Sequence, residues 1–426
     1  MLPSINMAAP LRRGLRAGRV LRAGLRAHLV LVPAAAPLAA AAGVSPLPRA
    51  GPAALAAVRA RRCTPCLRPL SFTRETNCTV ISRFFHTTSN AYRCTQAPMK
   101  ERHQNPYKLV QDDMSNLCDD IKKELVTGIA DLRDMTHYYF DGKGKSFRPM
   151  VVLLMARACN FHQHNTSEVS DSQRRIAMVA EMIHTASLVH DDVIDKANTR
   201  RGKPAVNFKW GEKKAILAGD FILSAASVAL ARLGNGDVVS LLSQVIDDLV
   251  NGEFMQLGSK ENENERFAHY LKKNFKKTAS LIAHSAKAVA VLGEVDTDVQ
   301  EIAFMYGKHL GIAFQLIDDV LDFTACGNQL GKPAAADLKL GLATAPVLFA
   351  CDKHPELHSM IMRRFSLTGD VEKAWEHVLE SDGVQQTRDL AQRYCSEAVK
   401  LISTLRPSPE RDALIRITEM VLTRDK

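Results

Sequence analysis

Two clusters of aspartates in this sequence have the residue type and spacing needed to bind a divalent cation. The first is His190-Asp191-Asp192-Val193-Ile194-Asp195, and the second is Gln315-Leu316-Ile317-Asp318-Asp319-Val320-Leu321-Asp322. In each cluster the outer carboxylates are four residues apart, so a helix would place both on one face, where their charges repel. A cation relieves that repulsion, and magnesium commonly combines one or two carboxylates with the phosphate oxygens of a substrate.

A solvated acidic face is the ordinary explanation of a charge run, and a single cluster would leave that explanation open. The second cluster, however, interrupts an apolar stretch, where unpaired carboxylates would be costly to bury. Two helices that jointly hold a metal and a diphosphate group account for both clusters. The expected metal ligands are therefore Asp191, Asp192, Asp195, Asp318, Asp319 and Asp322.

The segments that carry and surround these residues read as helices. Apolar residues recur at three- and four-residue intervals in the stretches 150–158, 176–189, 214–233, 238–257 and 301–321. Alternating, strand-like runs are scarce, and no fixed-period repeat or interdomain linker follows residue 105. The pattern predicts one all-α domain over residues 105–426.

The positive charge of the chain belongs to its N-terminal part. The first 74 residues contain twelve arginines and no acidic residue, so subtracting these twelve charges from the net +10 leaves −2 for the remainder. The near-neutral remainder argues against nucleic-acid binding. An acid-free, arginine-rich start with leucines at helical spacing is typical of a mitochondrial transit peptide, which we expect within residues 1–90, together with a disordered N-terminus.

The nine cysteines are scattered and odd in number, which fits free thiols in a reducing compartment. Cys63 and Cys66 form a lone CxxC without a second pair, so a zinc site at these two residues is not expected.

The DDxxD motif at 191–195 and the later Phe-Gln-x-x-DDxxD motif at 314–322 resemble those of the trans-prenyltransferases of isoprenoid biosynthesis. The resemblance covers nearly all of residues 105–426. It implies an isoprenoid-synthase-type helical bundle around a central cavity. It also implies an enzyme that uses Mg²⁺ to condense isopentenyl diphosphate onto an allylic diphosphate, such as farnesyl or geranylgeranyl diphosphate.

Basic residues stand where two diphosphates would need them. Lys145 and Arg148 precede an apolar helix, whose N-terminus favours anions, and His184 lies two turns before Asp191 on the same helix face. The resemblance assigns Lys145, Arg148, His184 and Arg201 to isopentenyl diphosphate, and Arg200, Lys277 and Lys332 to the allylic diphosphate. Thr278 and Gln315 would turn oxygens toward developing positive charge. Catalysis is thus expected to rest on Asp191, Asp195, Asp318, Lys277 and Gln315.

Four further residues near these motifs have weaker assignments. Lys276 is expected to face solvent, and Asp337 to lie near the same pocket. Glu253 and Gln256 share a helix face, which fits a structural hydrogen bond as well as a site role.

The size of the side chains before Asp191 predicts a long product. The growing tail would descend along this helix past Ala186 and Ser187, where family members with short products often carry a bulky aromatic residue. The resemblance therefore implies a forty- to fifty-carbon chain, the precursor of the ubiquinone side chain.

Two other functions remain open at this point. A class I terpene cyclase also uses aspartates and magnesium, but it has no need of an isopentenyl diphosphate site. A regulatory subunit with an inherited fold is the second alternative. Stretches such as GEFMQLGSKENENERFAHYL and LRPSPERDALI resemble a long-chain synthase that acts with a second, homologous subunit in a hetero-oligomer. The expected location is the mitochondrial matrix, with peripheral association at the inner membrane.

Overall fold

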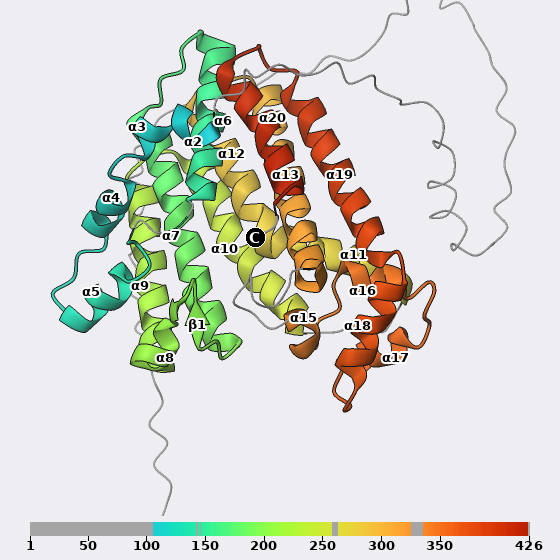
Figure 1. Cartoon of the computed structure of the whole chain (residues 1–426). Coiled ribbons are helices and arrows are strands. Elements are labelled where there is room, and N and C mark those ends of the chain that lie inside the picture. The colour runs from blue at the N-terminus through green and yellow to red at the C-terminus, as the bar shows by residue number, and fades with distance from the viewer. Residues whose placement is uncertain (1–104, 142–143, 145, 258–262, 325–334, 425–426) are drawn as a thin grey trace, which may run out of the picture. The chain divides into compact units, whose positions relative to one another are not determined.

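The computed structural model describes residues 105–426 except 142–143, 145, 258–262, 325–334 and 425–426 (Figure 1). All described residues belong to one compact unit, Thr76–Lys426. The first half contains α2 (Pro106–Leu109), α3 (Gln111–Met114), α4 (Leu117–Glu124), α5 (Ala130–His137), α6 (Phe147–His164), α7 (Asp171–Ile194), β1 (Thr199–Arg200), β2 (Lys203–Pro204), α8 (Val206–Trp210), α9 (Glu212–Ala231) and α10 (Gly236–Leu257).

The second half contains α11 (Glu263–Asn274), the π-helical turn η1 (Phe275–Ala279), α12 (Ser280–Leu292), α13 (Thr297–Thr324), α15 (Ala336–Lys339), α16 (Ala345–Ala350), α17 (Leu357–Met362), α18 (Asp370–Glu380), α19 (Gly383–Ile402) and α20 (Pro409–Leu422). The described part is therefore almost entirely helical, and the all-α prediction is confirmed. Four of the five apolar stretches noted above lie within one helix each, α6, α7, α10 or α13, and the stretch 214–233 extends two residues beyond the end of α9.

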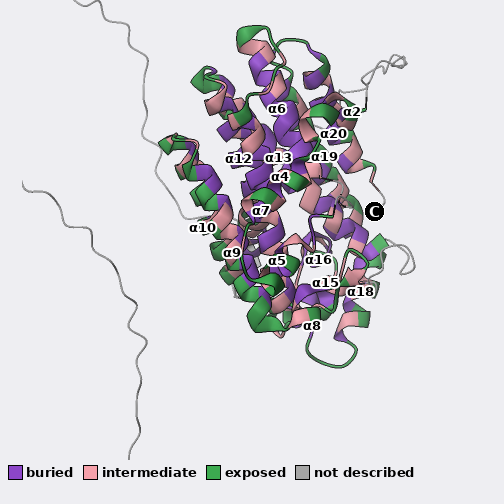
Figure 2. Ribbon diagram, turned by 90° about the vertical axis from the view of Figure 1, so that its left-hand side faces the viewer, coloured by how far each residue is buried: buried purple, intermediate pink, exposed green. Residues whose placement is uncertain are grey.

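Helices α12 and α13 form the centre of the bundle, where the buried residues of Figure 2 are concentrated. Two glycines of α13 allow its close approach to the segment that precedes and begins α12. A Cβ atom on Gly311 would lie 2.5 Å from the Cα atom of Ala279, and one on Gly307 would lie 2.7 Å from that of Ala283. This contact sets α13, which carries the second aspartate cluster, directly against η1.

The start of α7 is fixed by its own side chains and by two neighbouring helices. Ser170 and Gln173 form a capping box, in which Ser170 Oγ accepts a hydrogen bond from the Gln173 backbone N–H at 3.2 Å. The buried Gln173 side chain also donates to Asn160 of α6 and to the carbonyl of Val289 in α12, each at 2.9 Å. These contacts hold the helix that ends in the first aspartate cluster.

A two-stranded hairpin follows α7 and presents two arginines. β1 and β2 are antiparallel, with Arg200 opposite Lys203. The two turn residues, Arg201 and Gly202, both have positive φ, 51° and 73°. This conformation suits a tight two-residue hairpin but strains a residue with a side chain, and such strain is characteristic of functional sites.

The four cysteines of the described region (Cys118, Cys159, Cys351 and Cys395) are all free thiols, as expected; Cys63 and Cys66 lie outside it. Within that region, α9 is the helix whose length and composition suffice to cross a membrane. These two criteria are weak evidence of a membrane-spanning helix, because core helices of other proteins also satisfy them. Helix α9 packs along α7, and 39% of its most apolar window is buried.

Candidate active site

The first aspartate cluster lies at the C-terminal end of α7, beside a cavity. Asp191 lines this cavity together with Glu253 of α10 and Lys277 of η1. Burial raises the pKa of Asp191 to about 6, while the nearby Lys277 opposes the shift and Glu253 adds to it. Burial likewise raises the pKa of Asp195, and the charges of Lys277 and Glu253 act on it in the same way. Asp191 and Asp195 thus share one partly desolvated, negatively charged environment.

Asp192 points to the opposite side of the helix and is fully buried. Its Oδ1 accepts a hydrogen bond from Arg200 Nε at 2.8 Å, and its Oδ2 accepts one from the Tyr139 hydroxyl at 3.3 Å. Asn207 donates to its backbone carbonyl at 2.9 Å. This geometry argues against the prediction that Asp192 binds metal directly, because no oxygen faces the cavity. Instead Asp192 positions Arg200.

The second cluster, on α13, divides in the same way. Asp319 is 2% exposed, and it accepts hydrogen bonds from the Tyr270 hydroxyl and, at 2.9 Å, from Gln315 Nε2. Gln315 Oε1 in turn accepts from the Thr278 hydroxyl at 2.9 Å. Asp319 is therefore occupied within the protein, which argues against it as a direct metal ligand. It orients Gln315 and ties α13 to η1 through Thr278.

The outer residues of the second cluster have different partners. Asp322 caps α15, since its two oxygens accept hydrogen bonds from the backbone N–H groups of Ala336 and Asp337, each at 3.1 Å. Asp337, which was expected near the pocket, thus contacts the second cluster through its backbone N–H. Asp318 is half-exposed and pairs with Arg424, whose guanidinium also stacks 3.8 Å from the centre of the Phe314 ring. Both outer residues, Asp318 and Asp322, are intermediate in exposure.

The two neighbouring lysines of η1 point in different directions. Lys277 Nζ lies 2.5 Å from Glu253 and 3.1 Å from Gln256 Oε1, on the side of the cavity and of Asp191. Gly252 makes this possible, because a Cβ atom there would lie 2.7 Å from Lys277 Cγ. Both Glu253 and Gln256 therefore belong to the site. A π-helical turn is itself frequent at functional sites.

The expectation that Lys276 faces solvent is wrong. Its side chain is 17% exposed, and its Nζ lies 2.6 Å from Asp248, which is buried and also accepts a hydrogen bond from Ser280 at 2.6 Å. Successive residues of a helical turn point in different directions, so one lysine closes an internal ion pair and the other faces the cavity.

A second group of cations surrounds the start of α6. The charges of Arg148 and Arg201 both act on His184 and on Glu181, which completes the group. Burial lowers the pKa of Arg148 to about 10 and, with the neighbouring arginines, holds that of His184 well below its usual value. Buried Arg148 Nε has no hydrogen-bond partner within the described residues. A buried, under-satisfied guanidinium fits an anion.

Two of the expected diphosphate-binding residues, Lys145 and Lys332, lie outside the described residues. Gly144, next to Lys145, is described, and a Cβ atom on it would lie 3.2 Å from Nη1 of Arg201. The hairpin that carries Arg200 and Arg201 therefore touches the segment that begins α6.

The cavity beneath Asp191 is large and mainly apolar. It encloses about 430 Å³ between α7, α9 and α10, with walls formed by residues such as Leu223 and Leu249. Of the two candidate chain-length residues, Ser187 lines the cavity. Ala186 is fully buried in the main hydrophobic core and is not part of the lining. The two residues therefore contact different surroundings.

Several residues of this site were not identified from the sequence. Glu181 and Lys273 precede His184 and Lys277 by three and four residues, a helical spacing that would have revealed them. Lys273 is half-buried, within reach of the charges of Asp319 and Glu253, and desolvation lowers its pKa. The partners Tyr139, Tyr270 and Arg424 come from distant segments, and no local pattern marks them.

The residues present fit a divalent cation. Asp191, Asp195 and Glu253 place negative charge in a partly desolvated cavity, which raises two carboxyl pKa values and which a cation would relieve. Carboxylate oxygens are the ligands that Mg²⁺ and Ca²⁺ prefer.

Comparison with known proteins identifies the family. The family profile described as polyprenyl synthetase matches residues 129–378. The all trans-polyprenyl-diphosphate synthase of Homo sapiens is 66% identical over 346 residues, which are 81% of this chain and 82% of that protein. Decaprenyl-diphosphate synthase subunit 1 of Schizosaccharomyces pombe is 42% identical over 359 residues, covering 78% of this chain and 95% of that protein.

A solved structure supports the same assignment. The polyprenyl synthase from Caulobacter crescentus, crystallised with calcium and isoprenyl diphosphate, matches with a TM-score of 0.68 at 29% identity. The match covers 75% of this chain and 97% of that one. Fold and site thus define an all-α prenyltransferase. This chain belongs to the polyprenyl synthetase family and has its isoprenoid-synthase fold.

Proposed function

We propose that this chain is a Mg²⁺-dependent all-trans polyprenyl diphosphate synthase that adds isopentenyl diphosphate repeatedly to an allylic diphosphate. The proposal rests above all on one observation: Asp191, Glu253 and Lys277 stand at one apolar cavity, which combines a site for a metal and a diphosphate with room for a hydrocarbon tail. By similarity to its named relatives, the product is a forty- to fifty-carbon chain that serves as the precursor of the ubiquinone side chain.

Asp191, Asp195 and the accessible Asp318 would hold the divalent cation, which when bound stabilises the negative charge of the departing diphosphate. Lys277, held by Glu253 and Gln256, and Arg200, held by Asp192, add fixed positive charge at the allylic diphosphate. Because their partners are in place before substrate arrives, these cations need little reorganisation during ionisation.

Arg148 and Arg201 bind isopentenyl diphosphate in this scheme, and neutral His184 donates a hydrogen bond to it. Holding the second substrate beside the allylic carbon removes much of the entropic cost of bringing the two together. Thr278 and Gln315 turn oxygens toward the developing allylic cation, and Asp319 fixes the Gln315 amide by accepting from its Nε2. The departing diphosphate accepts the proton that is lost, so no side chain acts as base.

The function is tested by incorporation of labelled isopentenyl diphosphate into an apolar product. We expect incorporation with farnesyl or geranylgeranyl diphosphate and Mg²⁺, and its loss in excess EDTA with recovery on adding Mg²⁺. Conversion of the allylic diphosphate without any isopentenyl diphosphate would instead support the terpene-cyclase alternative.

Substitution of Ser187 with phenylalanine is expected to shorten the product by several isoprene units, because the ring would fill the cavity one helical turn below Asp191. Chromatography of the dephosphorylated products measures the change. Ala186→Phe is a less selective test, since its ring would overpack the core at a cost of about 1–3 kcal/mol. Products of unchanged length from Ser187→Phe would refute the assignment of this cavity to the tail.

A second, homologous subunit is the partner that we propose. Ile216 and Leu217 on α9 and Val250 and Phe254 on α10 are 43–72% exposed, and large exposed apolar groups of this kind mark association surfaces. The relative from S. pombe is itself described as a subunit. We expect the isolated chain to have low activity that rises at least tenfold when mixed with its partner.

Assays of the chain alone, of candidate second subunits alone and of the mixture decide this point. If the chain stays inactive in every mixture while a second subunit is active alone, the chain is a regulatory subunit. Full activity of the chain alone, unchanged by mixing, would remove the need for a partner.

The arginine-rich segment before Glu75 supports a mitochondrial location, and we propose that the mature enzyme resides in the matrix. Its apolar product favours peripheral association with the inner membrane. Import into isolated mitochondria with removal of about 90 residues would test both the location and the extent of the transit peptide.

A further inference from the structure

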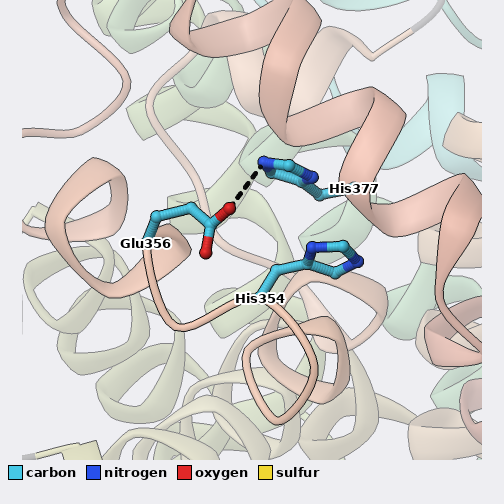
Figure 3. Close-up of side chains that lie close together, drawn as sticks. All are labelled: His354, Glu356 and His377. Atoms are coloured by element: carbon cyan, nitrogen blue, oxygen red, sulfur yellow. Dashed lines mark ion pairs between the residues drawn. The ribbon is translucent and has the colours of Figure 1, made fainter.

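A cluster of metal-binding side chains lies in the α16–α18 region, apart from the residues assigned to catalysis. His354 is in the turn after α16, Glu356 is the residue before α17, and His377 is on α18. One ligand atom from each can be chosen so that all three lie within 4.8 Å of one another. Figure 3 shows the carboxylate of Glu356 beside the two imidazoles.

The geometry of the cluster is close to that of a tetrahedral site. Nε2 of His377 lies 3.1 Å from Oε1 of Glu356, and ligand atoms bound at about 2.0–2.1 Å in tetrahedral zinc sites are roughly 3.3 Å apart. The imidazoles of His354 and His377 are stacked, with centres 4.3 Å apart. A pair of ligand atoms at the upper limit of 4.8 Å would have to approach by about 1.5 Å to reach the tetrahedral spacing, which side-chain rotation can supply.

His377 is held in place but lacks hydrogen-bond partners. Both of its ring nitrogens are buried, and neither makes a hydrogen bond of acceptable geometry within the described residues. Glu380, one turn further along α18, has an oxygen 3.8 Å from Nδ1. A carboxylate behind a histidine whose other nitrogen binds the metal is the usual outer arrangement of zinc sites.

We propose that His354, Glu356 and His377 form a zinc-binding site, with Glu380 orienting His377. Two imidazoles and one carboxylate favour Zn²⁺ over Mg²⁺, which prefers oxygen ligands alone. The fourth position would hold water.

The expected role of the bound Zn²⁺ is structural. It would join the turn before α17 to α18, and helices α17 and α18 both contribute to a separate hydrophobic cluster, for example through Leu357 and Val378. Phe323 of α13 belongs to the same cluster and is adjacent to Asp322. Zn²⁺ at this position would therefore stabilise the support beneath the second aspartate cluster without touching substrate.

The test uses the purified full chain without a polyhistidine tag, stripped with EDTA and then titrated with Zn²⁺ in the presence of millimolar Mg²⁺. A competing chromophoric chelator measures the affinity, and elemental analysis after gel filtration gives the stoichiometry. We expect one Zn²⁺ per chain and a higher Tm when Zn²⁺ is bound. His377→Ala and the milder Glu356→Gln should each weaken Zn²⁺ binding more than tenfold and remove the rise in Tm.

His358→Gln is the matched control, because this histidine of α17 pairs with Arg266 and is outside the cluster. It should bind Zn²⁺ as the unmodified chain does. The proposal is overturned if the chain retains no Zn²⁺, or if His377→Ala and Glu356→Gln retain it with unchanged affinity. In that case the contact between His377 and Glu356 is an ion pair alone.

Discussion

Replacing Asp191 with asparagine is expected to lower kcat/KM for isopentenyl transfer by about a thousandfold. The substitution keeps the shape of the side chain but removes the carboxylate of the first cluster that lines the cavity. A thousandfold change corresponds to about 4 kcal/mol of transition-state stabilisation, the scale on which a bound cation stabilises a leaving group. Initial rates with labelled isopentenyl diphosphate over a range of Mg²⁺ concentrations measure this effect.

The Asp191→Asn substitution should not lower the thermal stability of the metal-free protein. Burial raises the pKa of Asp191 to about 6 in the folded chain, above its usual value of 3.8. A carboxyl group with a raised pKa binds its proton more tightly in the folded state, so stability falls as pH rises from about 4 to about 6. Asparagine carries no charge to lose, and the Tm of Asp191→Asn at pH 7.5 is expected to equal or exceed that of the unmodified chain.

Two further variants make this prediction specific. Asp247→Asn removes an exposed carboxylate from α10 and should leave both activity and Mg²⁺ dependence unchanged. Asp192→Asn weakens the buried contact with Arg200, so it should lower Tm, unlike Asp191→Asn. Retention of more than a tenth of the activity by Asp191→Asn would exclude Asp191 as a principal metal ligand.

Replacing Lys277 with glutamine is expected to lower kcat/KM by about a hundredfold or more. Lys277 is the cavity-facing cation of η1, fixed by Glu253 and Gln256 beside Asp191. Loss of one preorganised group that stabilises developing charge usually costs two to three orders of magnitude. Because the proposed role of this lysine is to stabilise the charge of the departing allylic diphosphate, the effect should include kcat and not KM alone.

The neighbouring lysine supplies a matched control. Lys276→Gln removes a similar charge, but it breaks the ion pair with buried Asp248, a loss that costs about 3–5 kcal/mol in comparable cases. We expect a clearly lower Tm and near-normal activity at temperatures where the variant is folded. Equal losses of activity in Lys276→Gln and Lys277→Gln would contradict the opposite orientations of the two side chains.

Local sequence was sufficient to predict the helices and the faces of the aspartate clusters. The spacing of Asp191 and Asp195 fixes their common face, because 3.6 residues make one helical turn. The apolar periodicity of α7 and α13 was enough to predict both helices, and the DDxxD motifs were enough to indicate the family. Patterns of this kind depend only on residues a few positions apart.

Pairings between distant segments could not be predicted in the same way. Asp192 and Asp319 have the spacing of metal ligands, yet their carboxylates are occupied by Arg200 with Tyr139 and by Tyr270 with Gln315. Arg424 reaches Asp318 from a position 106 residues away. Which oxygen remains accessible is decided by these neighbours and by burial.

By itself, the sequence determined that two helices each carry aspartates on one face and that basic residues stand near them in the chain. This follows because the spacing of residues along a helix fixes the direction in which their side chains point. The tertiary structure alone decided that Lys276 closes an ion pair with buried Asp248 instead of facing solvent, and that the absent side chain of Gly252 leaves room for Lys277 beside the cavity. It also decided that Ser187 rather than Ala186 lines the cavity. Which side chain lines the cavity depends on how whole helices pack against one another. The close packing of their side chains involves residues from distant parts of the chain, so no short segment determines it.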